Sequence, residues 1–136
     1  AVNVIERSTL NQKGKPLQKE RWACVVDSVG GQTLANACAT SRYSGVVAAC
    51  GLAESMDFPV TVAPFILRGV TLAGIDSVQV PYAKRLSAWS QLAKEMPHEK
   101  INNMTASVIN LEQSIVAAQE LLDGKVKGRM VVNPNL

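Results

Sequence analysis

Three apolar runs, separated by segments of helix length, constrain the fold of this 136-residue chain more than any other feature. They span residues 23–29, 45–50 and 70–78, and glycine directly follows the first two. A continuous apolar run of this length is typical of a strand that is buried on both faces of a parallel sheet. The regular alternation of strands with helical segments predicts an α/β fold whose parallel strands are joined by right-handed crossovers.

The segments between and after these runs have the apolar spacing of helices. Residues 32–43 follow the first run, and residues 59–68 form a shorter helical segment that contains Pro64. A third helix begins after Pro81 and ends before Pro97. Its apolar stripe consists of Leu86, Trp89, Leu92, Ala93 and Met96.

The two ends of the chain are predicted to hold further strands. Residues 1–5 begin as a short strand, and residues 105–109 form another. Asn110 and Gln113 then have the spacing of a capping box, which predicts a helix that ends at Gly124. Residues 129–132 close the chain as a strand.

Composition excludes several classes of protein. A formal charge of +3 without a dense basic stripe argues against nucleic-acid binding, and no apolar run of membrane-spanning length occurs. Cys24, Cys38 and Cys50 are an odd number of widely spaced cysteines, which suits neither a disulfide framework nor a zinc site. We interpret them as small buried apolar residues and expect a reducing cytoplasm as the compartment. No metal site is expected.

The carboxyl ends of parallel strands are where ligands bind in sheets of this kind. Residues 27–30, 50–53 and 74–77 lie at these ends. Gly51 would let a ligand approach the backbone closely, although glycine after a strand is also ordinary turn punctuation. The chain contains no G-x-G-x-x-G, so the cradle for a dinucleotide pyrophosphate is missing.

Four segments carry a resemblance to a known family. They are "WACVVDSVGGQTLANACA", "YSGVVAACGLA", "PFILRGVTLAGIDSV" and "KGRMVVN". In that order and spacing they resemble the C-terminal part of the medium-chain dehydrogenase/reductase superfamily. Within it, the match is to the zinc-independent quinone oxidoreductase branch, in the acryloyl-CoA reductase (YhdH/YhfP) group. Members of this family are more than twice as long as the present chain.

The resemblance implies a domain division. Residues 1–100 would be part of an NADP-binding domain with a Rossmann-type doubly wound sheet, in the strand order 3-2-1-4-5-6. Residues 101–136 would return to the catalytic domain and contribute terminal strands to it. The chain would begin midway through the cofactor domain.

The resemblance also implies cofactor contacts. Leu52 and Ser77 match positions on the nicotinamide side of NADP, and Ile66 and Arg129 match other contacting positions. Arg7 resembles an arginine near the adenosine phosphate, with Glu6 in place of the usual asparagine. From the residues alone, a structural role remains open for each of them. The two arginines could be solvated, Leu52 and Ile66 could belong to the core, and Ser77 could bind its own turn.

Other candidate residues have weaker support. His98 is expected in a solvated loop, and Asp27 and Asp76 lack the partners that acid–base chemistry or a metal would need. The basic residues Lys13, Lys15, Lys19 and Arg21 could meet a coenzyme A phosphate, but a solvated loop is the favoured interpretation. The catalytic residues are unknown from this sequence.

The implied activity is NADPH-dependent reduction of the carbon–carbon double bond of an acryloyl-CoA-like thioester, or of a quinone, by hydride transfer. The chain alone is expected to be inactive. A non-catalytic cofactor-binding or dimerisation module and an unrelated doubly wound regulatory domain are the alternatives. NADPH titration separates them, because the regulatory domain would bind no nicotinamide.

Two strand edges lead to expectations about partners. In the family, two subunits pair their sixth strands, so a homodimer through residues 70–78 is expected. The apolar edge of residues 23–29 is an aggregation hazard when uncovered. We expect residues 1–5, or strands of another chain, to cover it.

Overall fold

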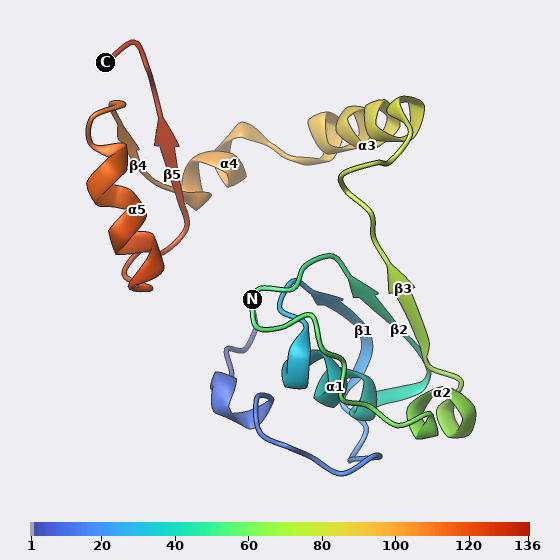
Figure 1. Cartoon of the computed structure of the whole chain (residues 1–136). Helices are drawn as coiled ribbons and strands as arrows, with labels where there is room; N and C mark the ends of the chain where they lie inside the picture. The colour runs from blue at the N-terminus through green and yellow to red at the C-terminus, as the bar shows by residue number, and fades with distance from the viewer. Residues whose placement is uncertain (1) are drawn as a thin grey trace. The chain divides into compact units, whose positions relative to one another are not determined.

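The computed structural model describes residues 2–136, which form two compact units, Ala1–Val80 and Pro81–Leu136 (Figure 1). Each unit has its own parallel sheet, of three strands in the first and two in the second. No helix among the described residues is both long enough and apolar enough to cross a membrane.

The sheet of the first unit consists of β1 (Trp22–Asp27), β2 (Ser41–Ala49) and β3 (Thr71–Gly74), in the order β1-β2-β3. All pairs are parallel. Helix α1 (Gly31–Ala39) connects β1 to β2, and the short helix α2 (Ala63–Arg68) precedes β3. The alternation of strands and helices predicted from the sequence is confirmed, and it places the carboxyl ends of the strands at one edge of the sheet.

Strands β2 and β3 have different ends from those predicted. β2 begins at Ser41 instead of residue 45, because Ser41 already pairs with Trp22 of β1. A bulge separates this pair from the regular register, which begins at Cys24 and Val46. β3 ends at Gly74 instead of residue 78. There the Asp76 carboxylate accepts hydrogen bonds from the amides of Val78 and Gln79, at 2.8 and 2.9 Å, and closes a turn.

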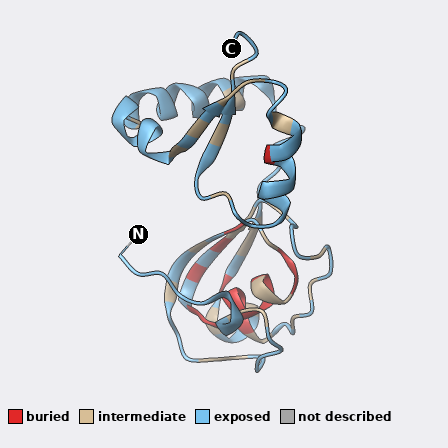
Figure 2. Ribbon diagram, turned by 90° about the vertical axis from the view of Figure 1, so that its left-hand side faces the viewer, coloured by how far each residue is buried: buried red, intermediate tan, exposed pale blue. Residues whose placement is uncertain are grey.

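The core of the first unit lies on one face of this sheet. It is formed by Leu34, Cys38, Val47 and Val70. Figure 2 shows the buried segments of this unit in red, on a helix and on the strands. On the other face of β1, Val26 is 77% exposed. The expectation of strands buried on both faces is therefore wrong for this chain, because α1 and its neighbours cover one face.

The three cysteines also differ in burial. Cys38 is buried, whereas Cys24 and Cys50 are exposed. The interpretation of all three as buried residues is correct for Cys38 alone. Cys24 points to the uncovered face of β1, in register with the exposed Val46.

Strand β1 has one open edge, since it pairs only with β2 among the described strands. Residues 2–5 do not form a strand, and Arg7–Thr9 form a 3₁₀ helix, η1, closed by hydrogen bonds from Thr9 to the Glu6 carbonyl. The expected strand at residues 1–5, and its cover of this edge, are therefore wrong for residues 2–5. Residue 1 lies outside the described residues.

The second unit contains three helices and two strands. They are α3 (Tyr82–Glu95), α4 (His98–Met104), β4 (Thr105–Ile109), α5 (Ser114–Leu122) and β5 (Arg129–Val132). β4 and β5 pair in parallel. The predicted helix after Pro81 is confirmed, but its apolar stripe is exposed, with Trp89 at 63%. His98 opens α4 instead of lying in a loop, because the Pro97 carbonyl accepts the first helical bonds.

The capping box before α5 is present as predicted. The Asn110 amide donates to the Gln113 side chain at 3.0 Å, and the Gln113 amide donates to the Asn110 side chain at 2.9 Å. Gly124 follows the helix with a φ of 69°. Both ends of α5 are thus set by local contacts.

Candidate functional site

The carboxyl ends of β2 and β3 enclose a shallow depression of about 480 Å³. Residues 49–52 and 74–78 line it, so Leu52 and Ser77 share one hollow. The Ile75 amide donates to the Ala49 carbonyl at 2.8 Å and holds the two turns together. Leu52 is 59% exposed and offers an apolar surface there. The predicted convergence of these turns is confirmed, whereas contact with a cofactor stays a prediction.

A second depression, of about 300 Å³, lies beside the first. Its lining includes Arg7, Ala53 and Glu54, and Ala53 directly follows Leu52 in the chain. The Glu54 carboxylate accepts a hydrogen bond of 3.4 Å from the Thr33 amide in the first turn of α1. A carboxylate thus occupies the N-terminus of α1, where backbone amides favour negative charge.

Asp27 has a structural role at this edge. Its side chain is 4% exposed and accepts hydrogen bonds from the amides of Val29 and Gly30, at 3.2 and 2.8 Å. These bonds fix the turn that follows β1, in which Gly30 has a φ of 75°. One oxygen of the carboxylate, Oδ2, thus accepts both bonds and gives Asp27 a structural role in this turn.

Gly51 is required by close packing of backbone against backbone. A Cβ atom added to it would lie 2.5 Å from the carbonyl oxygen of Ser28. The turn after β2 therefore presses directly on the turn after β1. This contact gives Gly51 a role that needs no ligand.

The other predicted contacts lie elsewhere. Ile66 is on α2 and 72% exposed, two residues before Arg68, which binds the carbonyls of Ala39 and Ser41 at the amino end of β2. Ile66 is thus at the opposite end of the sheet from Leu52. Arg129 is the first residue of β5 in the second unit and is exposed.

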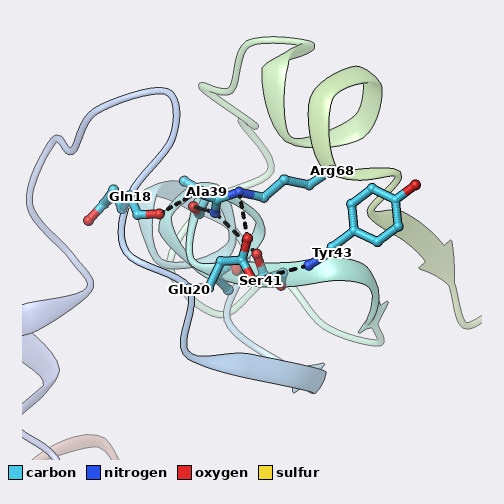
Figure 3. Close-up of polar contacts among 7 residues, drawn as sticks. Gln18, Glu20, Ala39, Ser41, Tyr43 and Arg68 are labelled. Carbon is cyan, nitrogen blue, oxygen red and sulfur yellow. Dashed lines mark hydrogen bonds and ion pairs between the residues drawn. The ribbon is translucent and has the colours of Figure 1, made fainter.

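Sequence reasoning assigned no role to Arg68, yet its guanidinium joins three segments of the first unit (Figure 3). Nη1 donates to the carbonyls of Ala39 and Ser41 at 3.0 and 3.2 Å, and Nη2 donates to Gln18 at 2.6 Å. Nε lies 3.4 Å from a carboxylate oxygen of Glu20. The one sequence signal for this structural role is that a cation directly follows the apolar run 65–67. Because these donors are occupied, Arg68 is not available as a phosphate ligand.

No cluster of three or more histidine, cysteine, aspartate or glutamate side chains among residues 2–136 is placed to hold a metal ion.

Comparisons with known proteins identify relatives of the whole chain. No family model matches it. The acrylyl-CoA reductase AcuI of Ruegeria pomeroyi is 43% identical over 136 residues, which are 99% of this chain and 41% of the relative. The probable acrylyl-CoA reductase AcuI of Escherichia coli is 40% identical and is matched over 90% of this chain and 38% of its own length. The putative quinone oxidoreductase YhfP of Bacillus subtilis is 36% identical, over 87% of this chain and 36% of its own length.

Solved structures give the same result. The YhdH oxidoreductase of Salmonella enterica, in complex with NADP, superposes with a TM-score of 0.89 and 39% identity, over 95% of this chain and 39% of that one. The YhfP protein of Bacillus subtilis, with NAD bound, superposes with a TM-score of 0.84 and 35% identity, over 95% of this chain and 40% of that one. The resemblance of this chain to the C-terminal part of the medium-chain dehydrogenase/reductase family, in the group of the acrylyl-CoA reductases and YhfP, is therefore confirmed, and the chain spans about two fifths of the length of these relatives.

Proposed function

We propose that this chain is the part of an NADPH-dependent oxidoreductase that receives the nicotinamide end of the cofactor. The observation that carries the proposal is the shared depression of Leu52 and Ser77 at the carboxyl ends of β2 and β3. This is the edge at which sheets of this type bind their ligands. The 43% identity to an acrylyl-CoA reductase supports the same assignment.

The whole protein would reduce the carbon–carbon double bond of an acryloyl-CoA-like thioester, or a quinone. A bound reduced nicotinamide supplies the hydride for such a reaction. The residues of the depression suit a planar ring that carries an amide. Leu52, Ile75 and Val78 give apolar surface on which a ring could lie, and Ser77 gives a hydroxyl group. The chain's own contribution would be to fix the position of the ring relative to the substrate.

The remaining contacts are proposed with different support. Arg7 lines the neighbouring depression, where a guanidinium could bind a phosphate with paired donors. Arg129 is an exposed cation that could do the same from the second unit. Ile66 has the least support of the five, because it lies at the amino end of the strands.

The proposal extends to domains, compartment and assembly. Residues 1–100 would belong to the NADP-binding domain and residues 101–136 to the catalytic domain of a zinc-independent, cytoplasmic enzyme. A homodimer through residues 70–78 would use the free edge of β3, which pairs only with β2 among the described strands. Since β3 itself ends at Gly74, the pairing would be short.

A titration of the isotope-labelled chain with NADPH, followed by amide chemical shifts, tests the cofactor site. Binding should be weak, since the pyrophosphate cradle is missing, and the shifts should gather at residues 49–52 and 74–78. Leu52→Asp should abolish them. Leu67→Asp, at a residue of similar exposure on α2, should leave them unchanged. Shifts confined to other residues would overturn the proposal.

A non-catalytic cofactor-binding or dimerisation module is the second candidate. The observation that favours it is the open edge of β3, which pairs only with β2 among the described strands. NADPH oxidation with acryloyl-CoA or a quinone, assayed with the chain alone, separates the two. We expect binding without turnover, and turnover comparable to that of a full-length relative would contradict the proposed lack of catalytic groups in this part.

A further inference from the structure

Two lysines line a pocket on the first unit that is separate from both depressions at the carboxyl edge. The pocket has a volume of about 310 Å³ and lies between residues 13–16, helix α1 and residues 59–61. Lys13 and Lys15 line it from the same loop, and neither Asp nor Glu is among its lining residues. Among residues 2–136, neither lysine forms an ion pair. The pocket therefore carries uncompensated positive charge.

The loop that bears these lysines is anchored by a buried amide. Asn36 is 4% exposed in the middle of α1. Its Nδ2 donates to the carbonyls of Leu10 and Gln12, both at 2.6 Å, and its Oδ1 accepts from Gln18 at 2.8 Å. A buried polar side chain with all its partners rigidifies the structure that it joins. Asn36 thus fixes the loop on both sides of the lysines.

Gly14, between the two lysines, brings the loop against the helix. A Cβ atom at this position would collide with the side chains of Asn36 and Gln18. The backbone at Gly14 therefore packs against the hydrogen-bonded side chains of Asn36 and Gln18. Lys13 and Lys15 flank Gly14 in the sequence. The backbone of this loop is thus anchored on α1, and the exposed side chains of Lys13 and Lys15 extend from an anchored segment instead of a free one.

We propose that this pocket binds the phosphate group of a nucleotide. Two ammonium groups provide the charge, and the neighbouring Gln32 and Thr61 add polar side chains to the lining. The sequence alone favoured a solvated loop for these lysines, and the anchoring by Asn36 and Gly14 is the reason to revise that interpretation. The inference stands without the proposed function, although coenzyme A and NADP are the two phosphate compounds that such a function would bring to the chain.

The test is a titration of the labelled 136-residue chain with inorganic phosphate, at an ionic strength held constant with chloride. The amides of Gly14, Gln32 and Thr61 should show saturable shifts. The double variant Lys13→Ala/Lys15→Ala should weaken binding by about tenfold or more, since both charged donors are lost. Lys13→Arg/Lys15→Arg keeps the charge and should retain binding.

A matched pair of lysines on α3 provides the control. Lys84→Ala/Lys94→Ala removes the same charge outside the pocket and should leave the affinity unchanged. Equal weakening by both double variants, or no saturable shift at the three amides, would overturn the proposal. Tighter binding of coenzyme A than of phosphate would assign the site to coenzyme A, and tighter binding of NADP would assign it to NADP. Shifts at residues 49–52 report the nicotinamide site separately, so either site can fail alone.

Discussion

At the scale of single residues, burial separates the three cysteines. The pKa of Cys38 is raised from 9.0 to about 11, firstly by burial of its side chain and secondly by the negative charge of Asp27. Cys24 and Cys50 are exposed. We predict that an aromatic disulfide reagent at about pH 8 modifies two thiols rapidly in the native chain and the third only in denaturant. Three rapid equivalents would contradict the burial of Cys38.

The same thiol links stability to pH. Its folded pKa is raised above the unfolded value, so the folded state holds the proton more tightly. The contribution to the free energy of unfolding is fully present below about pH 9 and is lost as the pH rises toward 11. Urea unfolding across this range, compared with that of Cys38→Ala, isolates the effect. A stability curve of the same shape in both proteins would exclude it.

Ser44 has strained backbone geometry. Its φ of 57° is the single positive value at a residue other than glycine among residues 2–136. Glycine adopts this conformation without the steric cost of a Cβ atom. Ser44→Gly should therefore stabilise the chain by about 0.5–1 kcal/mol in urea unfolding.

A neighbouring residue of the same strand is the control for Ser44. Arg42 is also exposed, and its φ is not in the positive range. Arg42→Gly should destabilise the chain, because glycine adds entropy to the unfolded state without relieving strain. Equal effects of the two substitutions would refute the strain at Ser44.

Burial on the sheet could be predicted from the sequence only in part. Val25 and Val26 are adjacent apolar residues of one run, yet the first packs against the core and the second is exposed. A continuous run gives no alternation from which to infer an uncovered face. The burial of Cys24 and Cys50 was misjudged for the same reason.

At the scale of elements, α2 depends on contacts that are distant in sequence. It has six residues, of which Pro64 is buried, so its own hydrogen bonds give little stability. Arg68 joins it to Ser41, Ala39 and Gln18, which precede Arg68 in the sequence by 27, 29 and 50 positions. Arg68→Met should lower the free energy of unfolding by about 2–4 kcal/mol, because three backbone carbonyls lose a charged donor.

Two further variants define the role of Arg68. Arg42→Met removes a cation from an exposed site and should change stability by no more than about 0.5 kcal/mol. Arg68→Lys keeps the charge but not the forked donors, so it should recover only part of the loss. Full recovery by lysine would show that charge alone, and not the geometry of the guanidinium, holds α2.

The elements that the sequence predicted best are those whose ends are local. The capping box of Asn110 and Gln113 spans four residues, and both of its hydrogen bonds form as expected. The ends of β2 and β3 depend on a bulge and on the turn at Asp76, which the apolar pattern does not record. The role of Arg68 was missed because its acceptors lie far away in the chain.

At the scale of the whole molecule, the order of strands and helices was enough to predict a parallel α/β fold. The turns after β2 and β3 converge as expected, because parallel strands end at one edge of a sheet. The cover of β1 could not be predicted in this way. Whether its edge is covered depends on which other strands are available, and residues 2–5 form no strand that pairs with it.

The two units should differ in stability, because the buried core lies almost entirely in the first. Val47 is 0% exposed there, whereas Ala117, at 9%, is the one buried residue among residues 81–136. A two-stranded sheet with so little buried apolar surface is marginal in water. Amide hydrogen exchange should therefore be faster at Val108 and Val131, in the paired β4 and β5, than at Val47 by about two orders of magnitude or more. Equal protection of the three valines would mean that the second unit gains its stability from contacts beyond its own core.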